Sequence, residues 1–185
     1  MAHTPTSIVK QRQDPLRARF RSGAADARIT DCARTVADAA DDPFHGTVVP
    51  GEGHGAQWRF GIHRAVGGYH DLPNPGDMLC AALASCLDAT LRMVADRLEI
   101  QIRSLEVVVD AELDVRGTLV VDRGVPVGFQ RMQCRVHMQP ADDADPAKVQ
   151  MLLAASEHSC VVLQTLRNSV SVDARIAAPL RPAAA

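Results

Sequence analysis

The chain has 185 residues, 46% of them hydrophobic and only 3% aromatic, with a formal charge of −2 at pH 7. This length and composition suit one folded domain with an aliphatic core and exclude a chain that is disordered throughout. The charge balance gives no electrostatic footprint for nucleic acid, no stretch reaches the roughly 20 apolar residues of a membrane span, and the N-terminus lacks the apolar core of a secretory signal. Five cysteines without a CxxC spacing fit neither a disulfide scaffold nor a zinc site, so we expect a cytoplasmic protein with reduced thiols.

The first third of the chain carries weak patterns. Residues 5–22 place a few apolar side chains among many charges and predict a helix or an arm. Residues 27–36 predict a strand, and the alternation of apolar and polar side chains in 57–63 predicts a second, half-buried one. Between them, residues 41–55 contain DDP, HG and PGEGHG, which are typical of a loop.

From Pro75 onward the sequence predicts one long buried helix. Leu79, Leu83, Cys86 and Thr90 recur at spacings of three or four residues, the period of an amphipathic helix. Proline suits the first helical position, and the small side chains of AALASC allow another element to approach closely.

The second half of the chain groups its strands and helices. Strands are predicted over 104–115 and 129–138, helices over 146–157 and 160–167, and a last strand over 169–176. This grouping predicts an α+β fold instead of an alternating α/β one. We divide the chain into an arm or helix (1–26), a folded domain (27–178) and a disordered tail (179–185).

Two cysteines, Cys86 and Cys160, are the best candidates for reactive groups. Cys86 lies in the middle of the long helix with no cation beside it in sequence, which does not favour a thiolate. Cys160 follows Ser159, a residue suited to cap a helix, so it should lie at or near a first turn, where free N–H groups stabilise a thiolate. Local physics therefore ranks Cys160 above Cys86, although most buried free cysteines only pack.

The remaining cysteines and the histidines are weaker candidates for reactive or metal-binding groups. Cys80 cannot share the helix face of Cys86, and Cys32 and Cys134 lie in strand patterns where we expect them to pack. The closeness of His158 and Cys160 in the sequence suggests a cysteine hydrolase. Catalytic dyads form by contact in the folded protein, however, so adjacency in the sequence is weak support. Four histidines fall within 26 residues without the tight spacing of a metal site: His45, His54, His63 and His70.

Four motifs stand in order along residues 56–176. They are ALASC in the long helix, a strand beginning at SLEV, RGTL followed by PVGF, and a cysteine that opens a helix before QTL. Together they resemble the OsmC/Ohr family of osmotically inducible and organic hydroperoxide resistance proteins. The N-terminal third resembles that family only loosely.

The resemblance implies an intertwined homodimer, with mixed or antiparallel sheets around central helices and the active site at the interface. It also implies a thiol peroxidase without a cofactor, in which Cys86 matches the peroxidatic nucleophile and Cys160 matches the resolving cysteine. An organic hydroperoxide would then give a Cys86–Cys160 disulfide that a dithiol reductant reopens. This reverses the local ranking, because the family activates its buried thiol with an arginine and a carboxylate from distant segments.

The chain departs from the family pattern at three places. The hydroperoxide resistance branch has a glutamate ten residues before the nucleophile, where this chain has Gly76, and the neighbouring Asp77 is the candidate replacement. The usual cysteine-proline is Cys160-Val161 here. Candidates for the partner arginine are Arg28, Arg34, Arg59 and Arg64, of which we choose Arg34.

These departures leave a second hypothesis open. It is a non-catalytic dimer that binds an apolar small molecule in the same pocket and uses its thiols only structurally. Two features separate the hypotheses: the distance between the two sulfurs, and an arginine beside them.

Overall fold

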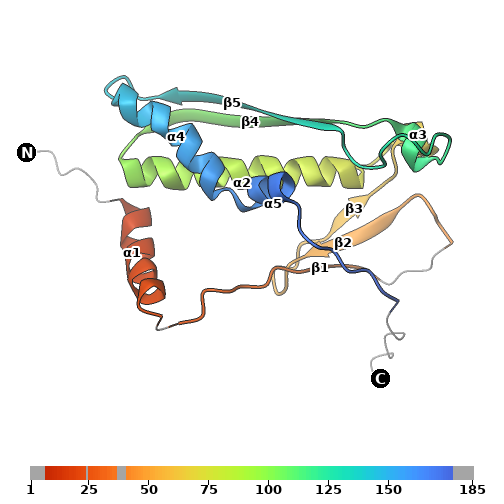
Figure 1. The fold of residues 1–185 in the computed structure, drawn as a ribbon, viewed down its shortest axis with the longest axis horizontal. Helices are drawn as coiled ribbons and strands as arrows, with labels where there is room; N and C mark the ends of the chain where they lie inside the picture. Colours follow the sequence, from red (N-terminus) through yellow and green to blue (C-terminus); the bar gives the residue numbers. More distant parts are fainter. Residues whose placement is uncertain (1–6, 24, 37–40, 177–185) are drawn as a thin grey trace, which may run out of the picture.

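The computed structural model describes residues 7–23, 25–36 and 41–176, and the predicted tail at 179–185 lies outside them. Figure 1 shows the long helix α2 (Pro75–Leu98) running along the paired strands β4 (Ile102–Glu112) and β5 (Arg131–Pro140). Helices α4 (Pro146–Ser159) and α5 (Val161–Asn168) pack against α2. The predicted α+β class is confirmed, because the strands pair with one another and the helices gather around α2.

Helix α2 confirms the predicted long helix, and local sequence sets both its ends. The side chain of Asn74 accepts hydrogen bonds from the N–H groups of Gly76 and Asp77, while Asp77 Oδ2 accepts from the Asn74 N–H at 2.9 Å. This is a capping box, with Pro75 at the first helical position. At the other end Glu99 adopts a left-handed conformation with φ 60°, which stops the helix.

The core is built around one face of α2 and is aliphatic, as the composition predicts. Its fully buried members come mainly from α2 and the two C-terminal helices: Leu83, Leu87, Leu91, Ala95, Ile100, Leu152, Cys160 and Leu163. By length and composition alone α2 is also long and apolar enough to cross a membrane, which a search for uninterrupted apolar residues misses. In this structure β4, α4, α5 and the N-terminal helix α1 (Ile8–Arg21) pack on α2 instead.

Strands β4 and β5 form an antiparallel hairpin whose register places Val107 opposite Val136 and Val109 opposite Cys134. Every other side chain of β5 is half-buried, and Met132, Cys134, Val136 and Met138 pack toward the core. The connection contains a short helix, α3 (Val115–Thr118), that the sequence patterns missed. Asp114 caps α3 through the N–H of Arg116, so β4 ends before the predicted residue 115.

The N-terminal strands form a separate three-stranded sheet at one end of α2 (Figure 1). It contains β1 (Ala33–Thr35), β2 (Gly46–Pro50) and β3 (Trp58–Phe60), in that order and antiparallel. The prediction of a loop over 41–55 was therefore wrong at β2. The β-branched residues Thr47, Val48 and Val49 favour a strand there, and the flanking glycines and prolines hid the pattern.

Helix α1 (Ile8–Arg21) confirms the predicted N-terminal helix. Polar contacts hold it against the C-terminal part of α2. Asp96 accepts hydrogen bonds from the Ser7 hydroxyl and from the Val9 N–H, and Lys10 Nζ lies 2.6 Å from Glu99 Oε1.

The predicted strand over 169–176 is wrong for the single chain. These residues pair with no strand within the described part of the structure, and Val172 and Ile176 are 84% and 103% exposed. A strand needs a neighbour to satisfy its backbone, and the chain folded alone provides none here.

Candidate active site

The structure brings the two predicted cysteines into contact. Cys160 Sγ lies 3.3 Å from Cys86 Sγ, and both are free thiols, although 74 residues separate them in the sequence. A disulfide bond is about 2.05 Å long, so the sulfurs need to approach by only roughly 1 Å to bond. Cys86 is half-buried and Cys160 is fully buried, so the pair meets inside the protein.

Cys86 sits on the core face of α2, where the helix is tightly held. Leu83 and Leu87 on either side of it are buried, and Thr90 one turn later donates its hydroxyl to the Cys86 carbonyl at 2.7 Å. The nucleophile candidate therefore has a rigid backbone.

Cys160 lies at the corner between α4 and α5, next to the first turn of α5 as the sequence predicts, but Ser159 does not cap that helix. Ser159 is the last residue of α4, and Cys160 itself occupies the N-cap position of α5 with φ −77° and ψ 108°. Its N–H donates to the Ser156 carbonyl and its carbonyl accepts from the Gln164 N–H, both at 2.9 Å. This extended residue ends one helix, begins the next and turns its sulfur toward Cys86.

Burial decides the charge state of Cys160. Loss of solvation raises the pKa of the Cys160 thiol. The backbone N–H groups of Leu163 and Val162 act in the opposite direction, and the neighbouring Cys86 thiol raises the pKa further. The helix N-terminus thus assists a thiolate as the sequence predicted, but burial outweighs it. Burial therefore disfavours the thiolate form of Cys160.

A cavity of about 570 Å³ is lined by residues of α2, α4, α5 and β5 and by the segment before β5. Leu79, Leu83 and Leu87 of α2 line one wall, and Leu163 and Leu166 of α5 line another. Neither Cys86 nor Cys160 lines this cavity, but Leu83 and Leu87 flank Cys86 along α2, and Leu163 lies one turn after Cys160.

Charged groups that the sequence analysis missed line the same cavity. Arg167 Nη1 lies 3.0 Å from Glu157 Oε2, and Arg131 also lines the wall. The Glu157 carbonyl accepts from Gln164 Nε2 at 2.7 Å, so the end of α4 is tied to α5 across Cys160. Glu157 lies three residues before Cys160 and Arg167 seven residues after it. This spacing around the cysteine is the sequence signal that could have found the ion pair.

Neither predicted activating residue contacts the thiols. The Asp77 carboxylate is held in the α2 cap, and nine helical residues place it about 14 Å along the axis from Cys86. Arg34 lies exposed on β1, opposite Val49. In residues 7–23, 25–36 and 41–176, no arginine hydrogen-bonds to either sulfur. The activating roles of Asp77 and Arg34 stay predictions.

The other three cysteines differ in their surroundings. Cys134 packs against the core as predicted, and burial raises its pKa. Cys32 is exposed, so the prediction that it packs was wrong, because β1 lies at the edge of a small sheet. Cys80 is half-buried, and burial and the Asp77 carboxylate raise its pKa.

The histidines do not gather into a metal site. His45 lies between two carboxylates, with Nδ1 2.7 Å from Asp42 Oδ2 and Nε2 3.1 Å from Asp71 Oδ1. The rings of His63 and His70 contact each other edge to face, with their centroids 4.3 Å apart. Among the residues that the structure describes, no group of three or more histidine, cysteine, aspartate or glutamate side chains is placed to hold a metal ion.

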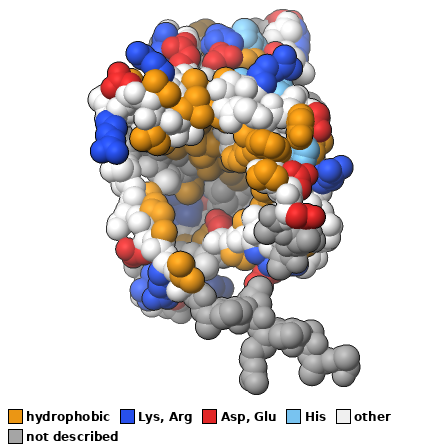
Figure 2. Space-filling view, turned by 90° about the vertical axis from the view of Figure 1, so that its right-hand side faces the viewer, with side chains coloured by type: hydrophobic (Ala, Val, Ile, Leu, Met, Phe, Trp, Pro, Cys, Tyr) orange, Lys and Arg blue, Asp and Glu red, His pale blue; other side chains and the backbone are white. Residues whose placement is uncertain are grey.

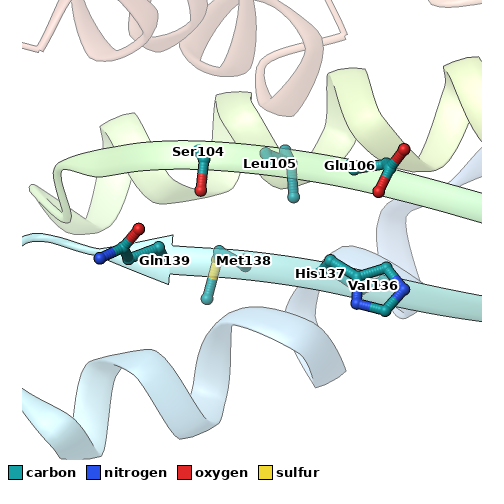
Figure 3. Close-up of a pocket in the computed structure, with 7 residues that line it drawn as sticks. All are labelled: Ser104, Leu105, Glu106, Val136, His137, Met138 and Gln139. Carbon is teal, nitrogen blue, oxygen red and sulfur yellow. The ribbon is translucent and has the colours of Figure 1, made fainter.

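A second cavity, also of about 570 Å³, lies over strands β4 and β5 (Figure 3). Its lining residues are Ser104, Leu105, Glu106, Val136, His137, Met138 and Gln139. Glu106 and His137 are cross-strand partners, and Figure 3 shows both extending from the strands. We place the functional site at the leucine-lined cavity, because its lining residues Leu87 and Leu163 lie next to Cys86 and one turn after Cys160.

Fold and site together define a small α+β protein whose two thiols meet at a helix corner and whose helices α2 and α5 line an apolar cavity. The chain belongs to the OsmC-like protein family, because the model of that family matches residues 68–175. A search of curated proteins finds no significant match.

Solved structures of this family share the fold at low sequence identity. An OsmC-like protein from Mycoplasma pneumoniae superposes with a TM-score of 0.60 at 13% identity, over 76% of this chain and 89% of that one. An OsmC-like protein of unknown function from Vibrio cholerae gives 0.60 at 13%, over 79% and 96%. An organic hydroperoxide resistance protein from Elizabethkingia anophelis gives 0.56 at 16%, over 78% and 93%. The chain is thus a divergent member that keeps the family's architecture.

Proposed function

We propose that this protein is an OsmC-type thiol peroxidase that reduces organic hydroperoxides with Cys86 and Cys160. The observation that carries the proposal is the 3.3 Å contact between the two sulfurs, and Leu87 and Leu163, which lie close to them in the sequence, line a cavity. Two thiols that close can form a disulfide with little movement, and an apolar cavity favours an alkyl peroxide over hydrogen peroxide. The name of the Elizabethkingia structure is in line with this substrate class.

The reaction consumes one hydroperoxide and two thiols. The Cys86 thiolate attacks the terminal peroxide oxygen, the O–O bond breaks, and the alkoxide leaves as the alcohol after taking a proton. Cys86 is now a sulfenic acid. Cys160 attacks the Cys86 sulfur, the S–S bond forms, the S–O bond breaks, and the oxygen leaves as water with the Cys160 proton. The peroxide gains two electrons from the two thiols, and a dithiol reductant restores them.

The roles of the two cysteines follow from their surroundings. Cys86 is only half-buried on a rigid helix, which lets a peroxide reach it. Cys160 is fully buried, and burial raises its pKa. Its thiolate is therefore disfavoured until Cys86 has become a sulfenic acid that the Cys160 sulfur can attack. A buried, protonated thiol suits the second step better than the first.

The functional unit in this proposal is a homodimer in the cytoplasm. Seen from the right-hand side of Figure 1, the molecule is hollowed, and hydrophobic side chains surround the hollow (Figure 2). Trp58 is 52% exposed and Val172 is 84% exposed, and residues 169–176 have no strand to pair with. A second copy would cover these groups and bring its own charged residues toward the thiols.

The second hypothesis, a non-catalytic dimer that binds an apolar molecule, has one observation in its favour. In the part of the chain that the structure describes, neither sulfur has an arginine hydrogen-bonded to it. The contact between the sulfurs counts against this hypothesis, because structural thiols have no need to meet. We therefore favour the peroxidase.

The Cys86→Ser variant tests the proposal. With cumene hydroperoxide and a dithiol donor, we expect the variant to lose turnover, because its hydroxyl is a far weaker nucleophile than a thiolate. The matched control is Cys80→Ser, which removes another half-buried thiol of the same helix and should keep the parent's rate. Parental turnover by Cys86→Ser would overturn the proposal.

A further inference from the structure

Ser156 has a buried hydroxyl without a partner. The residue is 0% exposed, and its Oγ makes no hydrogen bond to any described residue. A buried polar group that lacks a partner destabilises a protein by about 1–3 kcal/mol, so such a group calls for an explanation.

The hydroxyl lies one helical turn before Cys160. The Cys160 N–H donates to the Ser156 carbonyl at 2.9 Å, and Ser156 shares the buried face of α4 with Leu152. That face packs against α2, which carries Cys86. Ser156 is thus a fully buried polar side chain on the face of α4 that packs against α2, four residues before Cys160.

In the reduced protein the Ser156 hydroxyl makes no hydrogen bond to the Cys160 sulfur, which as a neutral thiol accepts hydrogen bonds only weakly. A thiolate is a much stronger acceptor, since hydrogen bonds to charged groups are about twice as strong as neutral ones. The second step of the proposed reaction requires Cys160 to lose its proton inside the core.

We propose that the Ser156 hydroxyl donates a hydrogen bond to the Cys160 sulfur as it becomes a thiolate and attacks the Cys86 sulfenic acid. This inference rests on the proposed peroxidase function and adds one residue to the resolving step. The hydroxyl keeps its own proton throughout. The Cys160 proton leaves with the oxygen that departs from Cys86 as water.

The surroundings of Cys160 show why another donor is needed. Burial raises the pKa of Cys160, and the N–H groups of Val162 and Leu163 oppose that rise only in part. These two donors come from the first turn of α5. Ser156 belongs to α4, so it adds a donor from the helix that precedes Cys160.

The test compares Ser156→Ala with Ser159→Ala. Ser159 lies on the same helix and next to Cys160, but it is exposed, so it controls for the loss of a serine. In single-turnover mixing with cumene hydroperoxide, we expect Ser156→Ala to form the Cys86 sulfenic acid at the parent's rate. Disulfide formation should slow by about tenfold, and Cys86 should accumulate more sulfinic acid.

Two further readouts separate this role from a structural one. In a Cys86→Ser background, the pH dependence of Cys160 alkylation, followed by mass spectrometry, should shift to higher pH in Ser156→Ala and stay unchanged in Ser159→Ala. Resistance to chemical denaturation should not fall, because the substitution removes an unpartnered polar group.

Each outcome has a distinct meaning. If the parent forms no Cys86–Cys160 disulfide with peroxide, the proposed function fails, whatever the serine does. If the parent forms the disulfide and Ser156→Ala forms it equally fast, the inference about Ser156 is overturned. The inference is also overturned if Ser156→Ala unfolds more easily and slows both steps alike, because Ser156 is then a packing residue.

Discussion

Cys160 reaches Cys86 because the corner between α4 and α5 falls against the middle of α2. The two sulfurs lie 3.3 Å apart. Cys160 has an extended backbone conformation, with φ −77° and ψ 108°, so α4 ends and α5 begins at this residue. The ion pair between Glu157 and Arg167 and the hydrogen bond from Gln164 to the Glu157 carbonyl hold the corner together.

Loss of the resolving thiol should have a different effect from loss of the nucleophile. In Cys160→Ser, Cys86 should still react with one equivalent of organic hydroperoxide, but the sulfenic acid should persist and oxidise further to sulfinic acid. Mass spectrometry of the intact protein after increasing doses of peroxide measures this. Cys134→Ser is the matched control, since Cys134 lines the leucine-lined cavity but does not belong to the thiol pair. Undiminished turnover by Cys160→Ser with a dithiol donor would remove Cys160 from the mechanism.

The helix face beside Cys86 should dominate stability. Leu87 is 2% exposed, so Leu87→Ala should lower the free energy of unfolding by about 2–5 kcal/mol, because the cavity it leaves cannot close fully. Leu166 lines the same cavity but is 39% exposed, and Leu166→Ala should lose markedly less. Urea denaturation followed by circular dichroism measures both variants. Equal losses would mean that the packing around α2 is not as the structure has it.

The start of α2 offers a test of Asp77. Both Asp77→Ala and Asn74→Ala break the capping box, and each should lower the free energy of unfolding by about 1 kcal/mol. The two variants differ in that Asn74→Ala keeps the carboxylate. The predicted assistance of Asp77 to Cys86 requires a slower reaction with hydroperoxide in Asp77→Ala alone. Equal rates in the two variants would leave Asp77 as a helix cap only.

His45 should respond to pH because carboxylates flank both its ring nitrogens. A neutral imidazole has one N–H, so donation to Asp42 and Asp71 together needs the protonated ring. The hydrogen bonds with Asp42 and then with Asp71 raise the pKa of His45 above its ordinary 6.5. The pKa of Asp42 falls below 3.8 through the Phe44 N–H and then His45, and that of Asp71 falls through His45.

The sign of the effect on stability follows from these directions. The contribution of His45 is fully present below pH 6.5 and is lost as the pH rises through its raised pKa. The contribution of the aspartates is present above pH 3.8 and is lost as the pH falls through their lowered pKa values. A nuclear magnetic resonance titration should give His45 a pKa above 6.5 in the parent and a lower one in Asp71→Asn. Asp26→Asn, which removes a carboxylate paired with Arg28, should leave it unchanged. Identical His45 titrations in Asp71→Asn and the parent would contradict the bridge.

The elements with a strong hydrophobic period could be predicted from the sequence, and the rest could not. The α2 helix and strand β5 follow from a regular spacing of apolar side chains, which local burial enforces. Strand β2 escaped because its five residues lie between glycine and proline signals. The segment 169–176 has a strand pattern, but a strand also needs a partner, and a sequence does not say whether that partner belongs to the same chain.

The residues of the candidate site also divide into those that sequence motifs could predict and those that only the fold reveals. Cys86 and Cys160 were found by their motifs, but their contact depends on how α4 and α5 cross α2, which no local pattern encodes. Ser156, Glu157 and Arg167 have ordinary helix positions in the sequence. Their importance comes from lying around the Cys160 corner, so only the fold could reveal it.

The most direct test of the central claim is peptide mapping of the parent protein after one equivalent of cumene hydroperoxide. The account predicts a single new disulfide between Cys86 and Cys160, with Cys32, Cys80 and Cys134 still free. It would be contradicted if Cys86 and Cys160 remained reduced, or if the bridge joined other cysteines.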